Sequence, residues 1–412
     1  MVLHKKIYHS TIKPVLNLVT FSKLRHRKKE KKQANMDQID KLVDILNQES
    51  KKTKKPVVVY VSHFDYYSPL QQRPNHMFNI LADKGYPCLF CSWKTEYENP
   101  RKHMHTIPYP WLSLILHKSF PKVLDVPYGY PYQSMPNFFQ YISDKSLVVY
   151  ELIDDFDLLT DASVIRQAKD MFKKLVKRDN TFVLASAKKL YKIAEDMGTP
   201  KSKLFLNQNA VNVTDFTKTI TNVPDIMQKL LAKKKPIIGY YGALTATWFD
   251  FKLIKDLVKK CPQYEFVLMG LKYPDKNIDK TERYFSELSK YDNFTYIPPV
   301  KYNEIPLYAK CWDVATIPFK INDITLGCSP VKLFEYMAMG LPIVTTPMPE
   351  CKLYKSVFIA KDANDFEKQI KTALRAKKTK KYQETLAREA SENTWEARVN
   401  DMIKIIEQNY KE

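Results

Sequence analysis

The most informative stretch for chemistry lies near residue 330, where Ser329-Pro330-Val331-Lys332 is followed by Glu335. Ser329 is a favourable N-cap and Pro330 a favourable first helical residue, so this spacing predicts the start of a helix. The free N–H groups of a first turn favour a bound phosphate, and Lys332 adds positive charge there. Glu335, on the same face, can accept hydrogen bonds from two adjacent sugar hydroxyls of a nucleotide. The spacing alone favours a simpler interpretation, an ordinary capped helix with an exposed Lys–Glu pair.

Four polar residues follow expected strands in the first half of the chain, namely His63, Arg73, Asp154 and Asp155. In open α/β sheets, ligands bind outside the carboxyl ends of the strands. Arg73 is therefore expected to face a cleft, and a carboxylate at 154–155 to orient an acceptor hydroxyl or act as a base. A loop role for His63 and a helix N-terminal charge for the two aspartates are equally consistent with the sequence.

Several other chemistries lack their motifs. The chain has only eight glycines, and none forms a G-x-G-x-x-G, a P-loop or a G-x-S-x-G sequence, which argues against a standard dinucleotide site, a P-loop and a hydrolase elbow. Cys88 and Cys91 form one C-x-x-C inside an apolar run. A zinc site needs four ligands, so two buried strand thiols are expected there. No histidine cluster resembles H-E-x-x-H, and no metal site is expected.

The composition of the 412 residues, 44% of them hydrophobic, is that of a globular protein with two to three domains. No run of about 18 apolar residues predicts a membrane-spanning helix. Residues 1–20 lack a small-residue cleavage site and do not resemble a secretory signal. The six scattered cysteines are then most simply free thiols in a reducing compartment. These features predict a cytoplasmic protein.

The net charge of +21 is unevenly spread, because residues 1–55 contain 15 Lys/Arg and 5 Asp/Glu. Residues 1–32 mix apolar side chains with a basic cluster, two weak signals that together can hold a protein at an anionic membrane surface, here the inner face of the plasma membrane. A solvated tail is nearly as consistent. A nucleic-acid arm is less so, because stacking aromatics are not interleaved, and no nucleic-acid partner is expected. An amphipathic helix over 36–46 and a linker over 51–55 follow.

Strand and helix patterns alternate twice along the remainder. This alternation predicts an α/β protein with two Rossmann-like, doubly wound parallel-sheet domains facing a cleft. The expected organisation is a basic extension over 1–55, a first domain over 56–215, a connection over 216–235, a second domain over 236–393, and a helix over 394–412 that packs back toward the first domain.

The segment from Ser329 to Val344 resembles the donor-site helix of GT-B glycosyltransferases, in particular family 4, the large retaining group. The resemblance covers about residues 56–410 and is specific in its second half. Residues 72–76 and 150–155 are similar to a branch that builds bacterial polysaccharides of the teichuronic-acid type. Further similar stretches, in the order that the family uses, are 206–211, 238–244, 266–270 and 308–318.

The resemblance implies roles for individual residues. The expected donor-binding residues are Gly242, Thr245, Asn322, Thr325, Ser329, Pro330, Val331, Lys332 and Glu335. The expected acceptor-side residues are His63, Arg73, Asp154 and Asn209, and the expected catalytic residues are Lys332, Asp155 and Arg73. The resemblance further implies no metal and no cofactor, with a UDP- or GDP-linked sugar as co-substrate.

The sequence departs from the family at several positions. Glu335 fits the second of two glutamates that the family spaces seven residues apart, but Gly327 stands at the first. Ala243 and Trp248 stand where an arginine and a lysine commonly follow the glycine turn. Pyrophosphate charge would then be neutralised by Lys332, by helix N–H groups or by Arg73.

Taken together, the sequence predicts a hexosyltransferase-type enzyme of cell-surface polysaccharide synthesis. It would move a sugar from a nucleotide-diphosphate sugar to a saccharide or lipid-linked acceptor, and the resemblance implies retention of configuration. The alternative is a catalytically inactive binding protein of the same fold that docks anionic polymer or membrane, and the missing glutamate and basic pair favour it.

Overall fold

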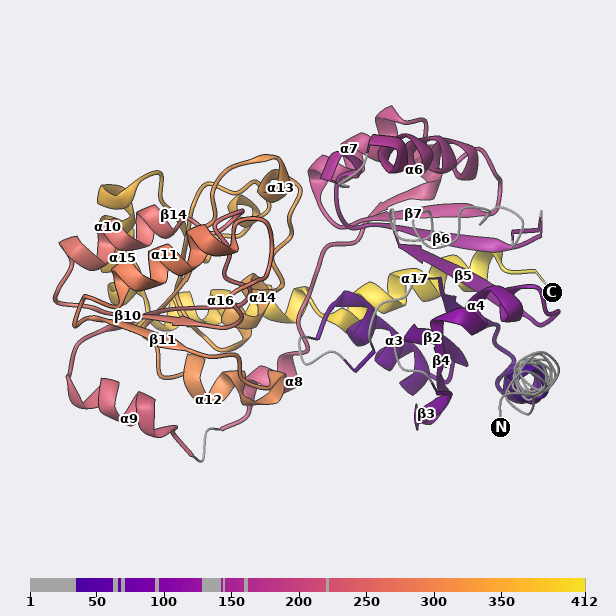
Figure 1. The fold of residues 1–412 in the computed structure, drawn as a ribbon, viewed down its shortest axis with the longest axis horizontal. Coiled ribbons are helices and arrows are strands. Elements are labelled where there is room, and N and C mark those ends of the chain that lie inside the picture. Colours follow the sequence, from indigo (N-terminus) through magenta and orange to yellow (C-terminus); the bar gives the residue numbers. More distant parts are fainter. Residues whose placement is uncertain are drawn as a thin grey trace, which may run out of the picture.

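The computed structural model describes residues 35–61, 66–67, 71–92, 96–127, 142–143, 145–158, 162–219 and 222–411. Within these residues the chain forms two α/β lobes, each built around one sheet (Figure 1). The predicted acceptor-side residue His63 and the predicted membrane contact over residues 1–32 lie outside the described residues.

The first lobe contains an eight-stranded sheet in which only β3 runs antiparallel to its neighbour. Runs of apolar and β-branched residues form its central strands because both faces of the sheet are covered. In sheet order, the strands are β3 (Glu98–Arg101), β4 (Met104–Pro108), β2 (Cys88–Ser92), β1 (Val57–Tyr60), β5 (Lys122–Pro127), β6 (Leu147–Leu152), β7 (Thr181–Ala185) and β8 (Leu204–Leu206).

Alternate side chains of β1 enter two separate cores, one on each face of this sheet. Val57 and Val59 pack under a helix over residues 35–53, α4 (Tyr109–Leu116), α6 (Ala162–Leu175) and α7 (Lys188–Asp196). Val58 and Tyr60 pack under α3 (Arg73–Asp83) and α17 (Trp395–Asn409). The short 3-10 turns of this lobe are η3 (Phe156–Leu158) and η4 (Lys201–Lys203).

The helix over residues 35–53 is longer than the sequence predicts. It continues through Thr53, so most of the expected linker over 51–55 is helical. Its Ile39 and Leu46 are fully buried in the first lobe's core. This part of the expected extension therefore belongs to the first lobe.

The second lobe contains a six-stranded parallel sheet with a single extended core. Its strands, in sheet order, are β11 (Phe294–Ile297), β10 (Glu265–Met269), β9 (Ile237–Tyr241), β12 (Val314–Ile317), β13 (Ile343–Thr345) and β14 (Val357–Ile359). Its helices are α8 (Val213–Thr217), α9 (Asp225–Ala232), α10 (Phe251–Lys260), α11 (Ile278–Leu288), α12 (Ile305–Ala309), α13 (Asp323–Leu326), α14 (Val331–Ala338), α15 (Ala363–Ala376) and α16 (Lys380–Glu392), with η5 (Tyr302–Glu304) and η6 (Cys351–Leu353).

The stretch 216–235, expected to be a connection, also differs from its prediction. It contains α9, whose Met227 and Leu230 are buried in the second lobe's core. Its polar composition reflects the exposed face of this short helix, which the polar residues cover.

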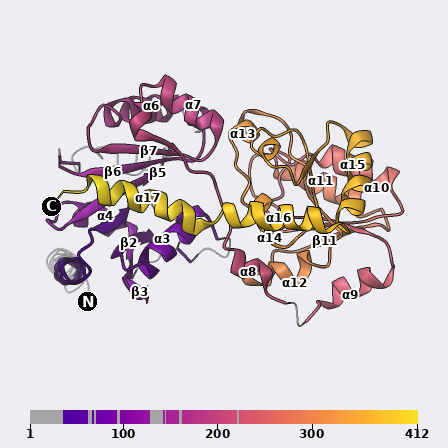
Figure 2. The ribbon, with the colours of Figure 1, turned by 180° about the vertical axis from the view of Figure 1, so that it is seen from behind.

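The chain crosses between the lobes near residues 207–213 and again near 393–395. At the crossing, the Val211 N–H donates to the Asn393 carbonyl over 3.0 Å, and the Trp395 N–H donates to the Val211 carbonyl over 3.1 Å. After it, α17 runs back along the first lobe in line with α16 (Figure 2). Trp395 and Val399 of α17 are fully buried there, so the end of the chain completes the core of the first lobe.

Candidate active site

A cleft of about 530 Å³ lies between the lobes, at the carboxyl ends of several strands. Asp154 and Asn209 reach it from segments that follow β6 and β8, and Gly242 reaches it directly after β9. From the first lobe, the lining residues are Gln71, Gln72, Asp154, Leu158 and Asn209. From the second lobe, they include Tyr240, Tyr241, Gly242, Ala243, Trp248, Val300, Tyr302, Ile305, Phe319, Ile324, Thr325, Cys328, Ser329, Pro330, Val331, Lys332 and Glu335.

The start of α14 forms one wall of this cleft. The helix begins at Val331, so Pro330 is the N-cap residue, with φ −74° and ψ 117°, and Ser329 precedes it. The prediction that Ser329 caps the helix and Pro330 opens it is therefore wrong by one residue. Proline has no side-chain acceptor, and the N-cap makes no side-chain hydrogen bond. The first N–H groups of α14 thus keep the capacity to bind an anion at the cleft wall.

Lys332 is held at this wall by aromatic rings. Its Nζ lies 5.4 Å from the centroid of the Tyr240 ring and 5.0 Å from that of the Phe319 ring, which is cation–π geometry. Within the described part of the chain, no carboxylate lies within ion-pair distance of Lys332. Burial lowers the pKa of Lys332 from its ordinary value, and the nearby Cys328 and Glu335 act in the opposite direction. A partly buried cation without a carboxylate partner suits an anionic ligand.

The glycine turn after β9 makes room for this lysine. Gly242 has φ +139°, a conformation that side chains other than glycine's rarely adopt. A Cβ atom at this position would also lie 3.0 Å from Cε of Lys332. Gly270 behind it, with φ +138°, approaches the Gly242 backbone so closely that a Cβ would lie 2.0 Å from the Gly242 carbonyl oxygen. Gly242 is therefore required by its positive φ and by the nearby Lys332 side chain. Gly270 is required because its loop packs directly against the Gly242 backbone.

Glu335 lies one turn into α14 and is 3% exposed. The Tyr302 hydroxyl donates to its Oε1 over 3.0 Å, and the Tyr241 hydroxyl donates to its Oε2. Burial raises the pKa of Glu335, and the two tyrosine hydrogen bonds act against that rise. A carboxylate has about four acceptor positions, so two remain for a ligand's hydroxyl groups. The alternative of an exposed Lys–Glu pair is therefore wrong, because neither side chain is exposed and the two do not form an ion pair.

The aromatic residues of the cleft were not predicted from the sequence. Tyr240 and Tyr241 end a strand, where an apolar run is usually read as core, and Tyr302 belongs to a 3-10 turn remote in sequence. Trp248, whose ring centroid lies 5.7 Å from that of Tyr273, stands at a position where the family commonly has a lysine. No spacing signal marks these side chains, because they converge only in the folded lobe.

Three of the predicted donor-binding residues have structural partners. Thr325 lines the cleft, but its hydroxyl donates to the Lys320 carbonyl over 2.5 Å. Asn322 caps α13 by accepting from the Thr325 N–H over 3.1 Å, and it does not line the cleft. Thr245 is fully buried, with its hydroxyl 2.6 Å from Oδ2 of Asp275. The geometry thus assigns the last two to the support of the loops behind the cleft.

The predicted residues of the first lobe separate into two groups. Asp154 and Asn209 line the cleft, and Asn209 Nδ2 donates to the Ser329 carbonyl of the opposite lobe over 2.7 Å. Asp155 does not line it and instead forms an ion pair with Lys189 Nζ over 2.9 Å. The expectation that Asp155 acts as base is therefore not supported by its position.

Arg73 also differs from its prediction. It is 4% exposed and does not line the cleft. Its Nε donates to Glu151 over 2.9 Å and a terminal nitrogen donates to Asn207 Oδ1 over 2.5 Å. Arg73 cannot neutralise a ligand in the cleft while its guanidinium is bound to Glu151, because that bond balances a buried carboxylate.

Further contacts hold the two walls together. Glu350 of the second lobe accepts from the Lys188 N–H at the start of α7 over 2.7 Å, and from Gln208 Nε2. Gly327, at the place of the family's first glutamate, packs near α7, where a Cβ would lie 3.4 Å from Leu190 Cδ2. A side chain at this position would therefore meet the first lobe.

The described residues contain no group of three or more His, Cys, Asp or Glu side chains that could hold a metal ion. None of the described helices is both long and apolar enough to cross a membrane.

The second lobe is similar to a known protein family. Residues 235–376, which make up most of this lobe, match the family model described as "Glycosyl transferases group 1". The resemblance predicted from the sequence is thereby confirmed over the residues that hold Gly242, Lys332 and Glu335.

A relative matches part of this chain, and the match spans about half of either sequence. The relative is TuaH of Bacillus subtilis strain 168, which is named as a glycosyltransferase of teichuronic acid biosynthesis. This chain is 23% identical to it over 186 positions. That match spans 45% of this chain and 45% of the relative.

Two solved structures share the arrangement of both lobes. Sucrose-phosphate synthase from Thermosynechococcus elongatus superposes with a TM-score of 0.64 at 14% identity, covering 86% of this chain and 98% of that one. Anabaena Alr3699/HepE in complex with UDP and glucose superposes with a TM-score of 0.65 at 12% identity, covering 85% and 98%. The predicted class, two doubly wound α/β domains of the GT-B type, is confirmed.

Proposed function

We propose that this protein is a glycosyltransferase that moves a sugar from a nucleotide-diphosphate sugar to a saccharide or lipid-linked acceptor. One observation supports this function above the others. Lys332, Glu335 and the free N–H groups of α14 meet at one wall of the cleft, and Lys332 has no carboxylate partner among the described residues.

The chemistry follows from where charge develops. When the bond between the sugar and the diphosphate breaks, negative charge grows on the leaving diphosphate. Lys332 and the N-terminus of α14 are positioned to stabilise that charge without reorganisation. Glu335, fixed by two tyrosines, presents its remaining acceptor positions to the ribose hydroxyls and so orients the nucleotide.

The acceptor would enter from the first lobe. Asp154 is the carboxylate that lines the cleft from that side, so it replaces Asp155 as the candidate for orienting the acceptor hydroxyl. Asn209 would hold the first lobe against the start of α14 through its hydrogen bond to the Ser329 carbonyl. We further propose retention of configuration and transfer without a metal, as the family resemblance implies.

A donor-hydrolysis screen with the full chain tests this function. Purified protein is incubated with UDP-, GDP- and CMP-linked sugars, and release of the nucleotide is measured. UDP-glucose is the first donor to try, because a protein of the same fold binds UDP and glucose. The full chain is needed because Ile39 and Leu46 belong to the core and a fragment from residue 56 would lack them. Failure to turn over any donor, with nucleotide binding retained, would contradict the activity.

A second candidate is a non-catalytic binding protein of the same fold, and Gly327 favours it, because the side chain proposed to contact the donor sugar is absent there. Thermal denaturation in the presence of nucleotide diphosphates separates the two. A donor site predicts stabilisation that grows with nucleotide concentration. A melting temperature that no nucleotide changes would favour the binding protein.

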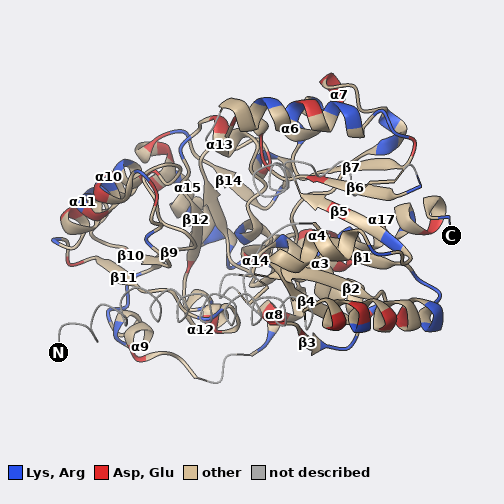
Figure 3. Ribbon diagram, turned by 45° about the vertical axis from the view of Figure 1, so that its right-hand side comes forward, with Lys and Arg blue, Asp and Glu red and all other residues tan. Residues whose placement is uncertain are grey.

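We also propose that the protein acts in the cytoplasm at the inner face of the plasma membrane, in the synthesis of a cell-envelope polysaccharide. The basic residues 1–32 support this place, and Lys and Arg residues also line α6 of the first lobe (Figure 3). Cosedimentation with vesicles of anionic and of neutral lipid tests it. Deletion of residues 1–32 should abolish binding to the anionic vesicles, and unchanged binding would contradict this role.

A further inference from the structure

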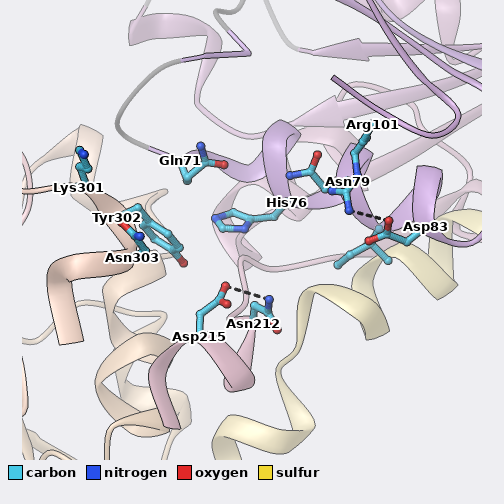
Figure 4. Close-up of a pocket in the computed structure, with 11 residues that line it drawn as sticks. Gln71, His76, Asn79, Asp83, Arg101, Asn212, Asp215, Lys301, Tyr302 and Asn303 are labelled. Atoms are coloured by element: carbon cyan, nitrogen blue, oxygen red, sulfur yellow. Dashed lines mark hydrogen bonds and ion pairs between the residues drawn. The ribbon is translucent and has the colours of Figure 1, made fainter. Parts of the chain in front are cut away.

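A second cavity of about 470 Å³ opens between the lobes beside the cleft. Tyr302 and Gln71 line both cavities, so these two side chains separate one from the other. We call this second cavity the side pocket. Figure 4 shows Lys301, Tyr302 and Asn303 of the second lobe facing His76 and Asn79 of α3. Its volume is within the range of small-molecule sites, about 300–1,000 Å³.

The formal charges of the side pocket balance. Arg101 forms an ion pair with Asp83 over 2.6 Å. Asp215 accepts from Asn212 Nδ2 over 2.9 Å, and the Lys301 ammonium supplies the remaining positive charge. Two cations and two carboxylates give the lining no net formal charge, so it lacks the excess of positive charge that would favour an anion such as a phosphate.

A buried histidine lacks a partner at the wall of the side pocket. His76 is 8% exposed, its ring stacks on Trp395 at 5.0 Å, and the Tyr302 ring lies 5.4 Å away. Its Nε2 makes no hydrogen bond within the described residues. Burial lowers the pKa of His76 to about 4, so the ring is neutral near pH 7. A neutral imidazole nitrogen pairs with a hydroxyl group, which can either donate or accept.

We propose that the side pocket binds a neutral sugar unit. Sugar hydroxyls both donate and accept, and the amides of Asn79 and Asn303 offer both functions in return. The Asn303 side chain makes no hydrogen bond within the described part of the chain, and Asn79 accepts only from the Tyr66 hydroxyl, over 2.8 Å, which leaves its Nδ2 for a ligand. The Tyr302 ring gives the apolar face of a sugar a surface to stack on.

The position of the side pocket suggests what it holds. Because Tyr302 lines both cavities, a sugar here would lie next to the cleft without occupying it. A neighbouring unit of a saccharide acceptor is the ligand that fits this place, and that part of the inference rests on the proposed function. The inference that the side pocket binds a neutral sugar does not depend on the proposed function.

Saturation-transfer NMR on the full chain tests the proposal. The neutral probes are glucose, galactose and N-acetylglucosamine, and the anionic probes are glucuronic acid and inorganic phosphate. We expect saturable binding of at least one neutral sugar. Asn303→Ala and Asn79→Ala should each weaken it about three- to tenfold, the effect of one lost hydrogen bond. The matched control is Gln38→Ala, an exposed amide on the helix over residues 35–53, which should leave binding unchanged.

Three results would overturn the side pocket as a sugar site. The first is that no neutral sugar binds, and the second is that the anionic probes bind in preference. The third is binding that survives both asparagine substitutions and is lost in Lys332→Ala, which would place the sugar in the cleft. Asn303 is exposed, so its substitution should not affect folding, and thermal denaturation of each variant checks this.

Discussion

The two walls of the cleft are built in different ways. In the second lobe, a glycine turn and the first turn of one helix bring Gly242, Lys332 and Glu335 together. In the first lobe, two of the polar residues expected at the cleft, Arg73 and Asp155, are bound to partners within that lobe. A site made from backbone turns is visible in a short stretch of sequence, whereas a site made from separate loops depends on how each side chain is paired. Substitutions in each wall test this contrast.

Substitution of Arg73 should have the strongest consequence, a loss of stability. Arg73→Ala leaves Glu151 buried without its cation, which should cost about 3–5 kcal/mol of unfolding free energy. Urea denaturation measures it. The control Lys252→Ala, which removes a surface pair with Asp256, should cost less than about 1 kcal/mol. If the Arg73→Ala protein is stable but binds nucleotide more weakly, the structural assignment of Arg73 is wrong and this residue acts on the ligand.

Lys332→Ala should have the next largest effect. Without this cation the leaving diphosphate loses its main charge stabilisation, so donor turnover should fall at least about tenfold, or about 1.4 kcal/mol. Turnover of the best donor measures it. Lys290→Ala, an exposed cation of the same lobe, serves as the control and should behave like the unaltered protein. If Lys332→Ala turns over the donor as fast as that control, Lys332 does not stabilise the leaving diphosphate.

Glu335→Ala should reduce turnover by a similar factor, about tenfold, but for a different reason. The loss of ribose contacts should appear mainly as weaker nucleotide binding, so KM should rise more than kcat falls. Steady-state kinetics with the same donor measures both constants. An unchanged KM would show that Glu335 does not contact the nucleotide.

Tyr302→Phe should shift a pH profile. The Tyr302 hydroxyl stabilises the charged form of Glu335 and so lowers the pKa of that carboxyl against the effect of burial. Its removal raises the pKa, so nucleotide affinity should begin to fall at a higher pH as the solution is acidified. Titrations of nucleotide binding across the acidic range measure this shift. Tyr308→Phe is the control, and equal profiles for the two variants would contradict the coupling.

The smallest effect is expected at Asp155. Asp155→Asn removes a partly exposed ion pair with Lys189, so turnover should stay within about twofold. Asp154→Asn, its neighbour at the cleft, should lower turnover more. Transfer to a saccharide acceptor measures both. A larger loss in Asp155→Asn than in Asp154→Asn would reverse the assignment of these two carboxylates.

The fold, and the presence of Ser329, Lys332 and Glu335 at the cleft, could be predicted because their signals are local. The alternation of apolar runs and amphipathic helices predicts two doubly wound sheets, and the residues from Ser329 to Glu335 lie within two turns. The residues that fix Glu335 could not be predicted, because Tyr241 and Tyr302 are remote in sequence from α14. The rings that hold Lys332, those of Tyr240 and Phe319, are likewise separate from α14 along the chain, although Phe319 lies nearer.

The first lobe was harder to predict for a related reason. β5, with its buried Asp125, was not recognised, and neither was α4. Arg73 follows a strand and opens a helix, so its position in the sequence favoured the cleft. Its pairing with Glu151, 78 residues away, is a tertiary contact that no local pattern contains.

The bridge between Val211 and Thr394 has a mechanical consequence. The two crossing segments are hydrogen-bonded to each other at this point, so they should move together when the lobes move relative to one another. Glu350 of the second lobe contacts the first lobe at a different place, through its hydrogen bonds with Lys188 and Gln208. Separation of the two lobes to exchange ligands would then break the two Glu350 contacts and keep the hydrogen bonds between the crossing segments.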